Sequence, residues 1–395
     1  MRLLVRAAAA STLAATALLA PSAAAHAAAL TCGGSAAPTF GTATPDTSLN
    51  AQFTSYGNGN GNGNALLDDW TGADSTYSVK LPDGRTVFGF SDTFLGKVNA
   101  DGSRPMAVAD GGTTPFVNNT FVVRSAAGAL TGTAHGGTAA NPTALLPPRD
   151  ASHVYWAGDM TVNGGEIQQP YREYKVGSGD LDVTWDANVL ARFSTSDLTR
   201  PTSVTSLPSG SGVMWGSALL RDGGYTYVYG TEDLGSGGKH MYVARVAGTD
   251  LRGTWSYLAA GGAWSPSESA AVEVLGGVSN EFSVSKRGNF YVLLTQDTKD
   301  AFSAQIDTYL SCSPAGPFTD ERTVYNTPEG GPFGSYGDPD VYTYNAHAHA
   351  SLTTANRLVV SYNVNSLDTT TGPTRDVYRD VSIYRPRFVD VPVTG

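Results

Sequence analysis

The sequence predicts an all-β protein, and more particularly a five-bladed β-propeller. Three observations lead to this prediction. The 395 residues include 46 Gly and 21 Pro, and only 15% are charged, against about 25% in ordinary globular proteins. Short runs of Val, Tyr, Thr and Phe alternate with turns marked by Gly, Asn and Asp, as in antiparallel sheets. A hairpin-like unit also recurs, and no 3.6-residue apolar period typical of helices runs through it.

Four copies of this unit are readable, each with a polar turn between two apolar runs. They span residues 74–90, 215–229, 278–294 and 346–362, and a weaker copy is expected between Ser152 and Pro208. The first gap between copies is about twice as long as the later gaps, so it has room for that fifth unit. Repeats of about four strands each are typical of propeller blades. A β-sandwich is the structural alternative, because it too has regularly spaced short strands.

The N-terminus has the order of a secretory signal peptide over residues 1–27: two arginines, an Ala/Leu-rich run and a small-residue end at Ala25–Ala27. We therefore expect a secreted, extracellular protein. Residues 28–64 are expected to form an N-terminal extension that ends in a flexible loop, Gly57–Asn64, because alternating Gly and Asn cannot bury apolar surface. The propeller itself is expected over residues 65–395.

The negative charge of the chain argues against certain classes of binding partner. The formal net charge is −10, and it becomes −12 once the two arginines of the signal peptide are removed. Such a surface repels nucleic acid and anionic membranes, so neither is expected as a partner. No later segment has the ~18 consecutive apolar residues of a membrane helix. We expect a monomer.

The sequence also lacks the short motifs of serine hydrolases, zinc proteases and phosphate-binding loops.

The two cysteines, Cys32 and Cys312, are expected to form a disulfide. An exported protein meets an oxidising environment, and unpaired thiols would have no evident use there. Because the two residues lie far apart in the sequence, the bond would attach the N-terminal segment to a distant sheet.

The inner strands of several blades converge on the channel of a propeller, so residues that are distant in sequence meet there. The candidate catalytic carboxylates on or near such strands are Asp74, Asp92 and Glu281. The candidate substrate-binding residues are Trp70, Trp156, Trp215, Glu232, Asn280 and His347. Aromatic rings beside carboxylates suit a sugar, whose C–H faces pack on rings while its hydroxyls bond acids and amides. Each aspartate could instead cap a turn, and Glu281 could be a buried acid paired with an arginine.

Two histidines, His347 and His349, lie two residues apart on a predicted strand and so face the same side. A third nitrogen or thiolate ligand does not lie near them in the sequence, so a zinc site is not predicted. Hydrogen-bonded structural histidines are the favoured interpretation.

Two segments resemble a known family. Residues 73–79 (ADSTYSV) and 89–96 (GFSDTFLG) are similar to the opening motif of a bacterial propeller family long catalogued as a domain of unknown function. That family is now associated with endo-D-arabinanases that cut mycobacterial cell-wall arabinan. The match extends more loosely through residues 345–365, although Ser91 stands where the family often has Gly. Residues 310–318 (LSCSPAGPF) resemble a blade-edge turn of the five-bladed furanosidases of glycoside hydrolase family 43.

The resemblance implies a catalytic pair, Asp74 and Asp92, and a third acid, Glu281, because family 43 enzymes take their general acid from a later blade. We expect Asp74 to face Asp92 or Glu281 across an open cleft that also holds a tryptophan. The resemblance implies no cofactor. A structural calcium ion near a channel histidine stays an open alternative.

The function expected from the resemblance is endo-acting cleavage of D-arabinan by a secreted glycoside hydrolase whose partner is a polysaccharide. Two alternatives stay open, because one fold hosts many functions. One is a non-catalytic glycan-binding propeller, which would keep Trp156 and Trp215 but need no acid pair. The other is an arabinofuranosidase or arabinanase that acts on plant L-arabinan.

Overall fold

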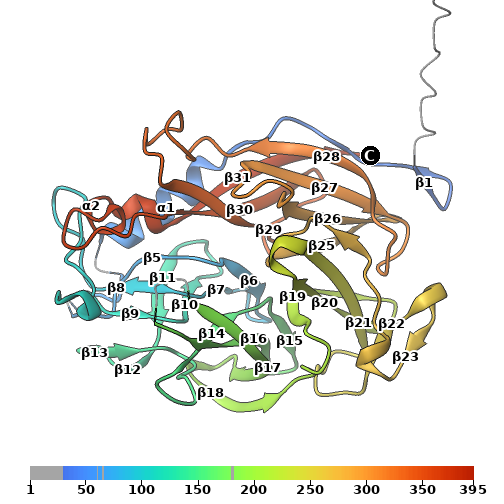
Figure 1. The fold of residues 1–395 in the computed structure, drawn as a ribbon, viewed down its shortest axis with the longest axis horizontal. Helices are drawn as coiled ribbons and strands as arrows, with labels where there is room; N and C mark the ends of the chain where they lie inside the picture. Colours follow the sequence, from blue (N-terminus) through green and yellow to red (C-terminus); the bar gives the residue numbers. More distant parts are fainter. Residues whose placement is uncertain (1–29, 60, 65, 179–181) are drawn as a thin grey trace, which may run out of the picture.

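The computed structural model describes residues 30–395 except 60, 65 and 179–181, and the expected signal peptide lies outside the described residues. The described chain is a five-bladed β-propeller, as predicted (Figure 1). Its five large antiparallel sheets follow one another around the molecule in sequence order, from the blue and cyan strands through green and yellow to the red ones. No helix in the described part of the chain is long and apolar enough to cross a membrane.

Each blade has an inner strand followed by strands farther out. Blade 1 comprises β6 (Tyr77–Lys80), β7 (Thr86–Phe90), β10 (Thr120–Arg124) and β11 (Leu130–Ala134). Blade 2 comprises β14 (His153–Ala157), β15 (Thr161–Asn163), β16 (Glu166–Val176), β17 (Val183–Ser194) and β18 (Asp197–Ser206). Blade 3 comprises β19 (Met214–Asp222), β20 (Tyr225–Asp233), β21 (Lys239–Ala247), β22 (Trp255–Leu258), β23 (Trp264–Ser265) and β24 (Leu275–Gly276).

Blades 4 and 5 complete the ring. Blade 4 comprises β25 (Phe282–Arg287), β26 (Phe290–Gln296), β27 (Gln305–Ser311) and β28 (Thr319–Asn326). Blade 5 comprises β29 (Val341–Ala348), β30 (Arg357–Ser366), β31 (Pro386–Thr394), β3 (Thr39–Phe40) and β4 (Thr44–Pro45). The inner strands β19, β25 and β29 contact one another in succession. Trp215 lies on β19, His347 on β29, and Glu281 directly precedes β25, so all three are at inner strands as predicted.

The predicted hairpins form because a turn that reverses the chain lies between two apolar runs that can pair as strands. Between β6 and β7 the chain reverses at Gly84, whose φ of +90° is a conformation that glycine adopts without strain. All five residues of β7 are buried, since this strand lies between β6 and β10 and packs on both faces. The hairpins of β19–β20, β25–β26 and β29–β30 likewise confirm the other readable copies, and β14–β18 confirm the weaker one.

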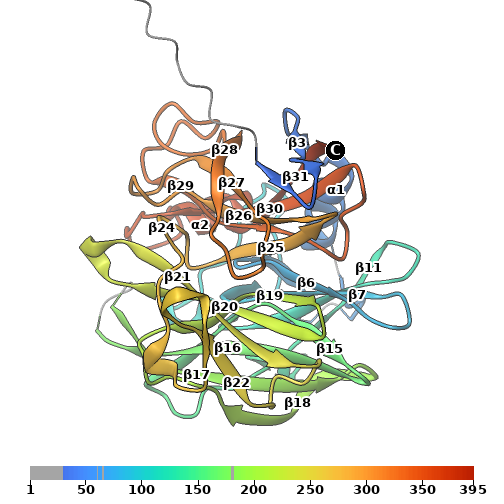
Figure 2. The ribbon, with the colours of Figure 1, turned by 90° about the vertical axis from the view of Figure 1, so that its right-hand side faces the viewer.

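The N-terminal extension is part of the propeller, which differs from our expectation. Strands β3 and β4 pair with β31, so blade 5 is built from both ends of the chain. Helix α1 (Thr47–Asn58) follows, and it contains the first two residues of the expected Gly57–Asn64 loop. Figure 2 shows β3 and α1 beside β31 at one edge of the molecule.

Helix α1 forms because its sequence has a cap and an apolar face. The Asp46 side chain accepts a hydrogen bond from the backbone N–H of Leu49 (2.9 Å), which is the usual cap of a helix N-terminus. Leu49, Phe53 and Tyr56 are buried, at the spacing of one helical face. The Phe53 ring lies 5.0 Å from that of Phe388 on β31. The folded domain therefore begins before residue 65.

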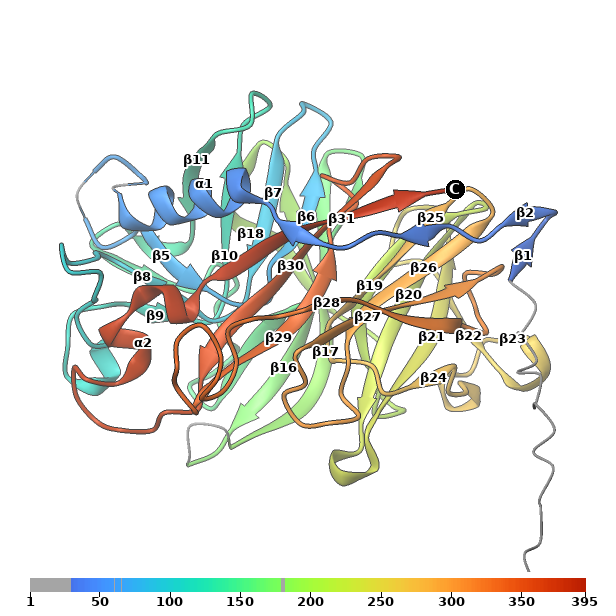
Figure 3. The same cartoon turned by 90° about the horizontal axis from the view of Figure 1, so that it is seen from above.

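A disulfide joins Cys32 to Cys312, as predicted, with 5.3 Å between the Cα atoms. Cys32 lies in the terminal hairpin of β1 (Thr31–Cys32) and β2 (Ser35–Ala36), and Cys312 directly follows β27 of blade 4. Figure 3 shows the blue N-terminal segment running from this hairpin past β31 to α1. The bond therefore ties the segment to blade 4 before it completes blade 5.

The remaining elements extend the blades, and some of them build the site. A three-stranded sheet of β5 (Trp70–Ala73), β8 (Thr93–Leu95) and β9 (Phe116–Val117) adjoins blade 1. It lies beside α2 (Asp376–Arg379) at the left of Figure 1. The other elements are β12 (Gly136–Thr138), β13 (Asn141–Thr143) and the short 3₁₀ helices η1 (Val108–Asp110), η2 (Gly235–Gly237), η3 (Ala260–Gly262), η4 (Glu268–Ala270) and η5 (Val381–Tyr384).

Candidate active site

A kink in the chain places Asp74 between two sheets. Strand β5 ends at Ala73 and β6 begins at Tyr77, and between them Ser75 and Thr76 have φ values of +71° and +65°. Such angles cost roughly 1–3 kcal/mol for a residue other than glycine and persist only where the surroundings hold them. One such contact is the hydrogen bond from the Asn363 amide to the Thr76 hydroxyl (3.0 Å).

Asp74 and Asp92 lie side by side on adjoining strands. The backbone N–H of Asp74 donates to the carbonyl of Asp92 (3.1 Å), and that of Ser91 donates to the carbonyl of Asp74 (3.1 Å). We expected the two acids to face each other across a cleft. The structure instead joins them through their backbones, because the β5–β8 pairing continues to this point.

The half-buried Asp74 is held by two tyrosines of blade 5. Its Oδ2 accepts hydrogen bonds from the hydroxyls of Tyr344 (2.8 Å) and Tyr384 (3.1 Å), whereas its buried Oδ1 has no partner among the described residues. Burial and then the nearby charge of Asp92 hold the pKa of Asp74 well above its usual range, and the tyrosine hydroxyls only partly oppose this. Burial and the charge of Asp92 therefore both favour the protonated form of Asp74, and its Oδ1 has no hydrogen-bond partner among the described residues.

Asp92 has a different environment. Its Oδ1 accepts hydrogen bonds from the Asn118 amide (2.9 Å) and from the indole N–H of Trp156 (3.0 Å). Burial raises the pKa of Asp92 to about 6, while these two donors favour the anion. A pKa of about 6 favours the ionised form of Asp92 at pH 7. The expected tryptophan beside the acids is Trp156.

Asp92 opens into a cleft of about 300 Å³, at the lower end of the range for small-molecule sites. One wall comes from β8, β9 and the η1 loop between them, and the other from blade 5 and the segment that follows β30. The aromatic and amide side chains that line the cleft include Phe94, Phe116, Tyr342, Asn365 and Tyr384. The cleft therefore offers carboxylate, amide and aromatic groups together.

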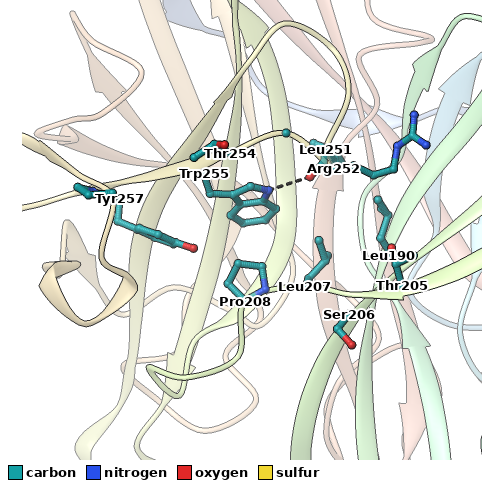
Figure 4. A pocket seen from close by; sticks show the side chains of 12 residues that line it. Leu190, Thr205, Ser206, Leu207, Pro208, Leu251, Arg252, Thr254, Trp255 and Tyr257 are labelled. Carbon is teal, nitrogen blue, oxygen red and sulfur yellow. Dashed lines mark hydrogen bonds between the residues drawn. The ribbon is translucent and has the colours of Figure 1, made fainter.

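A larger cleft, of about 460 Å³, lies between blades 2 and 3 (Figure 4). Trp255 and Tyr257 line it, and the indole N–H of Trp255 is bonded to the carbonyl of Leu251 (2.8 Å). No carboxylate is among the described residues that line this cleft. It lacks the groups for acid–base chemistry, so size alone does not identify the site.

Glu281 is buried, with 5% of its surface exposed. Its Oε1 lies 2.7 Å from the Ser75 hydroxyl and 3.4 Å from the guanidinium of Arg172. Burial raises the pKa of Glu281 to about 7, against the opposing charge of Arg172. The Ser75 hydroxyl is also 2.7 Å from that of Ser91, which connects Glu281 to the hairpin of the acid pair. These contacts match the alternative in which Glu281 is a buried acid paired with an arginine.

Two of the three predicted tryptophans lie in the core. Trp70 is fully buried, and its ring lies 5.5 Å from that of Phe53 and 5.4 Å from that of Phe90. Trp215 is also fully buried, and its indole N–H donates to Glu268 (2.8 Å). Neither ring presents a face to a ligand, because each strand turns its indole toward the packing between sheets. Only Trp156 adjoins the acid pair.

The other predicted binding residues do not gather at the cleft. Glu232 accepts a hydrogen bond from the Tyr242 hydroxyl (2.7 Å) in blade 3. The backbone carbonyl of Asn280 accepts hydrogen bonds from Arg172 (3.0 Å) and from Ser217 (2.8 Å), which ties blades 2, 3 and 4 together. These contacts give both residues positions in the scaffold.

The two histidines are buried in the channel. Nδ1 of His347 lies 3.0 Å from the carbonyl oxygen of Phe282, and burial lowers the pKa of His347 to about 4. His349 lies between the hydroxyls of Ser78 and Ser361, each 2.8 Å away. Both are hydrogen-bonded structural residues, as favoured from the sequence.

Within the described residues, the side-chain cluster with metal-ligand spacing is Asp338, Asp340 and Asp376, which does not include His347. Arg379 already ion-pairs with two of its members, Asp338 (3.1 Å) and Asp376 (2.6 Å). His347 is not a member of this cluster, and calcium near a channel histidine stays a prediction from the sequence.

The sequence analysis missed three residues of the site, namely Tyr344, Tyr384 and Asn118. Tyr344 follows Tyr342 by two residues on β29, and this alternation was a usable sign that both rings share one face of the strand. Tyr384 and Asn118 lie in loops and short elements, where the sequence carries no comparable sign.

The fold and the site together define a five-bladed propeller with a carboxylate pair beside an aromatic cleft at one mouth of its channel. The chain belongs to the family described as Domain of unknown function (DUF5005), whose profile matches residues 64–392. No curated protein shows significant sequence similarity to it. The family description names no activity, so the resemblance to endo-D-arabinanases does not by itself assign a substrate.

Three solved structures show different degrees of similarity to the chain. A presumed hydrolase from Bacteroides ovatus superposes with a TM-score of 0.71 at 22% identity, over 88% of this chain and 90% of that one. An α-L-arabinofuranosidase from Podospora anserina has a TM-score of 0.43 at 11% identity, over 86% and 94% of the two chains. A thermostable family-43 glycoside hydrolase has a TM-score of 0.45 at 13% identity, over 83% and 91%. Only the first of these scores supports a shared fold, and at 22% identity it supports nothing more, so function has to be argued from the site.

Proposed function

We propose that this protein is a secreted, monomeric glycoside hydrolase that cleaves furanose polysaccharides, with endo-acting cleavage of D-arabinan as the specific reaction. The observation that carries the proposal is the pair of adjoining carboxyl groups, Asp74 and Asp92, whose environments differ. Asp92 has a pKa of about 6 and opens into the cleft, whereas the pKa of Asp74 lies well above its usual range. Two acids held in opposite protonation states are the working parts of glycoside hydrolysis.

The two acids then have separate roles. Asp74 donates its proton to the glycosidic oxygen as the bond from that oxygen to the anomeric carbon breaks. Ionised Asp92 either removes a proton from the attacking water or itself bonds the anomeric carbon before water releases the sugar. Tyr344 and Tyr384 position Asp74 through its Oδ2, and Asn118 and Trp156 position Asp92. Glu281 acts behind them, through Ser75.

The substrate class rests on the surroundings of the acids and on the sequence resemblance. Aromatic rings such as Phe116 and Tyr342 line the cleft together with the amide of Asn365, a combination that suits sugar rings and their hydroxyls. The specific choice of D-arabinan comes from the motifs at residues 73–79 and 89–96, which resemble those of endo-D-arabinanases.

The direct test is to incubate the purified protein with D-arabinan and with plant L-arabinan and to measure the size of the products. We expect D-arabinan to be cut to oligosaccharides of intermediate length, as internal cleavage requires. Release of single arabinose units from L-arabinan alone would replace the proposal with an arabinofuranosidase. Binding without any product would replace it with a glycan-binding propeller.

A further inference from the structure

We propose that Phe302 and Tyr342 form a sugar-binding subsite away from the acid pair, so that the protein prefers substrates that span several sugar units. This inference rests on the proposed function and deepens it. Phe302 lies between β26 and β27 of blade 4, and 55% of its surface is exposed. The sequence analysis assigned no role to either residue.

The position of Phe302 is held in spite of its exposure. Its φ of +54° is uncommon for a bulky side chain. Its ring centroid lies 4.4 Å from that of Tyr342, and the two planes are tilted by 53°. The Phe302 ring packs against Tyr342 on one side, and because over half of its surface stays exposed, its outer side is available to the C–H face of a sugar.

Tyr342 connects this ring pair to the site. Its side chain lines the same cleft as Asp92, and its ring lies 5.2 Å from that of Tyr344. The Tyr344 hydroxyl donates to Asp74. A row of three rings therefore leads from exposed Phe302 to the acid pair, and a bound polysaccharide that follows the row places one sugar at Phe302 while another is at Asp74.

A second exposed phenylalanine provides a contrast. Phe333, in the loop between β28 and β29, is fully exposed, and no aromatic ring pairs with it among the described residues. It is also absent from the lining of the Asp92 cleft. Phe333→Ala is therefore the matched control for Phe302→Ala, since each change removes one exposed aromatic ring from a loop between two strands.

The test compares the wild type with Phe302→Ala, Phe302→Trp and Phe333→Ala on polymeric D-arabinan and L-arabinan and on the corresponding disaccharides. For the polymer that is cleaved, we expect Phe302→Ala to raise KM about tenfold, the usual scale for losing one aromatic contact and its buried area. The rate on the disaccharide should stay within about twofold. Phe302→Trp should restore the polymer KM, and Phe333→Ala should leave it unchanged.

Binding provides a second readout, measured by electrophoresis of the same ring variants in the Asp92→Asn background through gels that contain each polymer. We expect slower migration that Phe302→Ala abolishes. An unchanged KM and unchanged migration would overturn the subsite, as would an equal loss on polymer and disaccharide or the absence of any polymer binding. Migration that depends on Phe302, in a protein without hydrolytic activity, would support the subsite and reject the proposed hydrolysis.

Discussion

Two polar regions lie a short distance apart in this propeller and differ in what their groups contact. At the mouth, Asp92 lines the cleft, and Asp74 beside it is held by the hydroxyls of Tyr344 and Tyr384. In the channel, Glu281 contacts Arg172 and Ser75, and His347 contacts the backbone of blade 4. The difference indicates that Glu281 and His347 hold blades together, whereas Asp92 faces a space that a ligand can enter. Each of the following experiments tests that division.

The largest expected effect is on activity at the mouth. Asp92→Asn and Asp74→Asn are nearly isosteric, so each variant should fold with a Tm close to that of the wild type. Hydrolysis of the preferred arabinan should fall by about two to four orders of magnitude, the scale of losing a positioned acid or base. A rate within a few fold of the wild type for both variants would remove the acid pair from the mechanism.

The next effect concerns stability in the channel. Glu281→Ala removes the carboxylate that pairs with buried Arg172 (3.4 Å), and an arginine left buried without its partner costs about 3–5 kcal/mol. Urea unfolding should show this loss, and Glu281→Gln, which keeps the bond to Ser75, should show less of it. If Glu281→Ala keeps the stability of the wild type but loses activity by a hundredfold or more, Glu281 belongs to the catalytic acids after all.

The pH profile distinguishes the regions without a mutation. Asp92 has to be ionised, and its pKa is about 6, so kcat/KM should fall as the pH drops through about 6. Asp74 has to keep its proton, so activity should fall again once the pH passes the pKa of Asp74, which is raised above its usual range. His347, with a pKa of about 4, stays neutral throughout. A profile that is flat between pH 5 and about 7 would contradict the role of Asp92.

The smallest effect should come from Asn118, which donates to Oδ1 of Asp92 and so favours its anion. Losing one such hydrogen bond is worth roughly 0.5–1.5 kcal/mol. Asn118→Ala should therefore move the acid limb of the profile upward by about half to one pH unit, with little change in the rate at its optimum. A limb that stays in place would show that Trp156 alone holds Asp92.

The sequence predicted the blades better than the site. The hairpins were readable because Gly-marked turns lie between apolar runs, as at Gly84. Helix α1 was missed although Leu49, Phe53 and Tyr56 have helical spacing, because the Gly/Asn repeat after them dominated the interpretation. Asp92 could be predicted as an acid at the end of a strand. The exposure of each tryptophan could not be predicted, because it depends on which face of its sheet the side chain occupies.

The partners of Asp74 could not have been predicted in the same way. Tyr344 and Tyr384 are 270 and 310 residues from it along the chain, and only closure of the ring brings them within hydrogen-bonding distance. The kink at Ser75 and Thr76 is equally hidden, since neither residue type favours a positive φ. Both features arise from tertiary contacts, which local sequence patterns do not encode.

The construction of blade 5 from both ends of the chain sets an order of events during biosynthesis. Strands β3 and β4 emerge from the ribosome before blades 1 to 4, whereas their partner β31 emerges after them. Until then the ring stays open, and neither Tyr384 nor the packing surface of α1 on Phe388 is in place. The bond from Cys32 to blade 4 holds the waiting strands near the gap that β31 fills. The backbone bonds between Asp74 and Asp92 are local, but the tyrosine contacts that hold Asp74 exist only once the ring is closed.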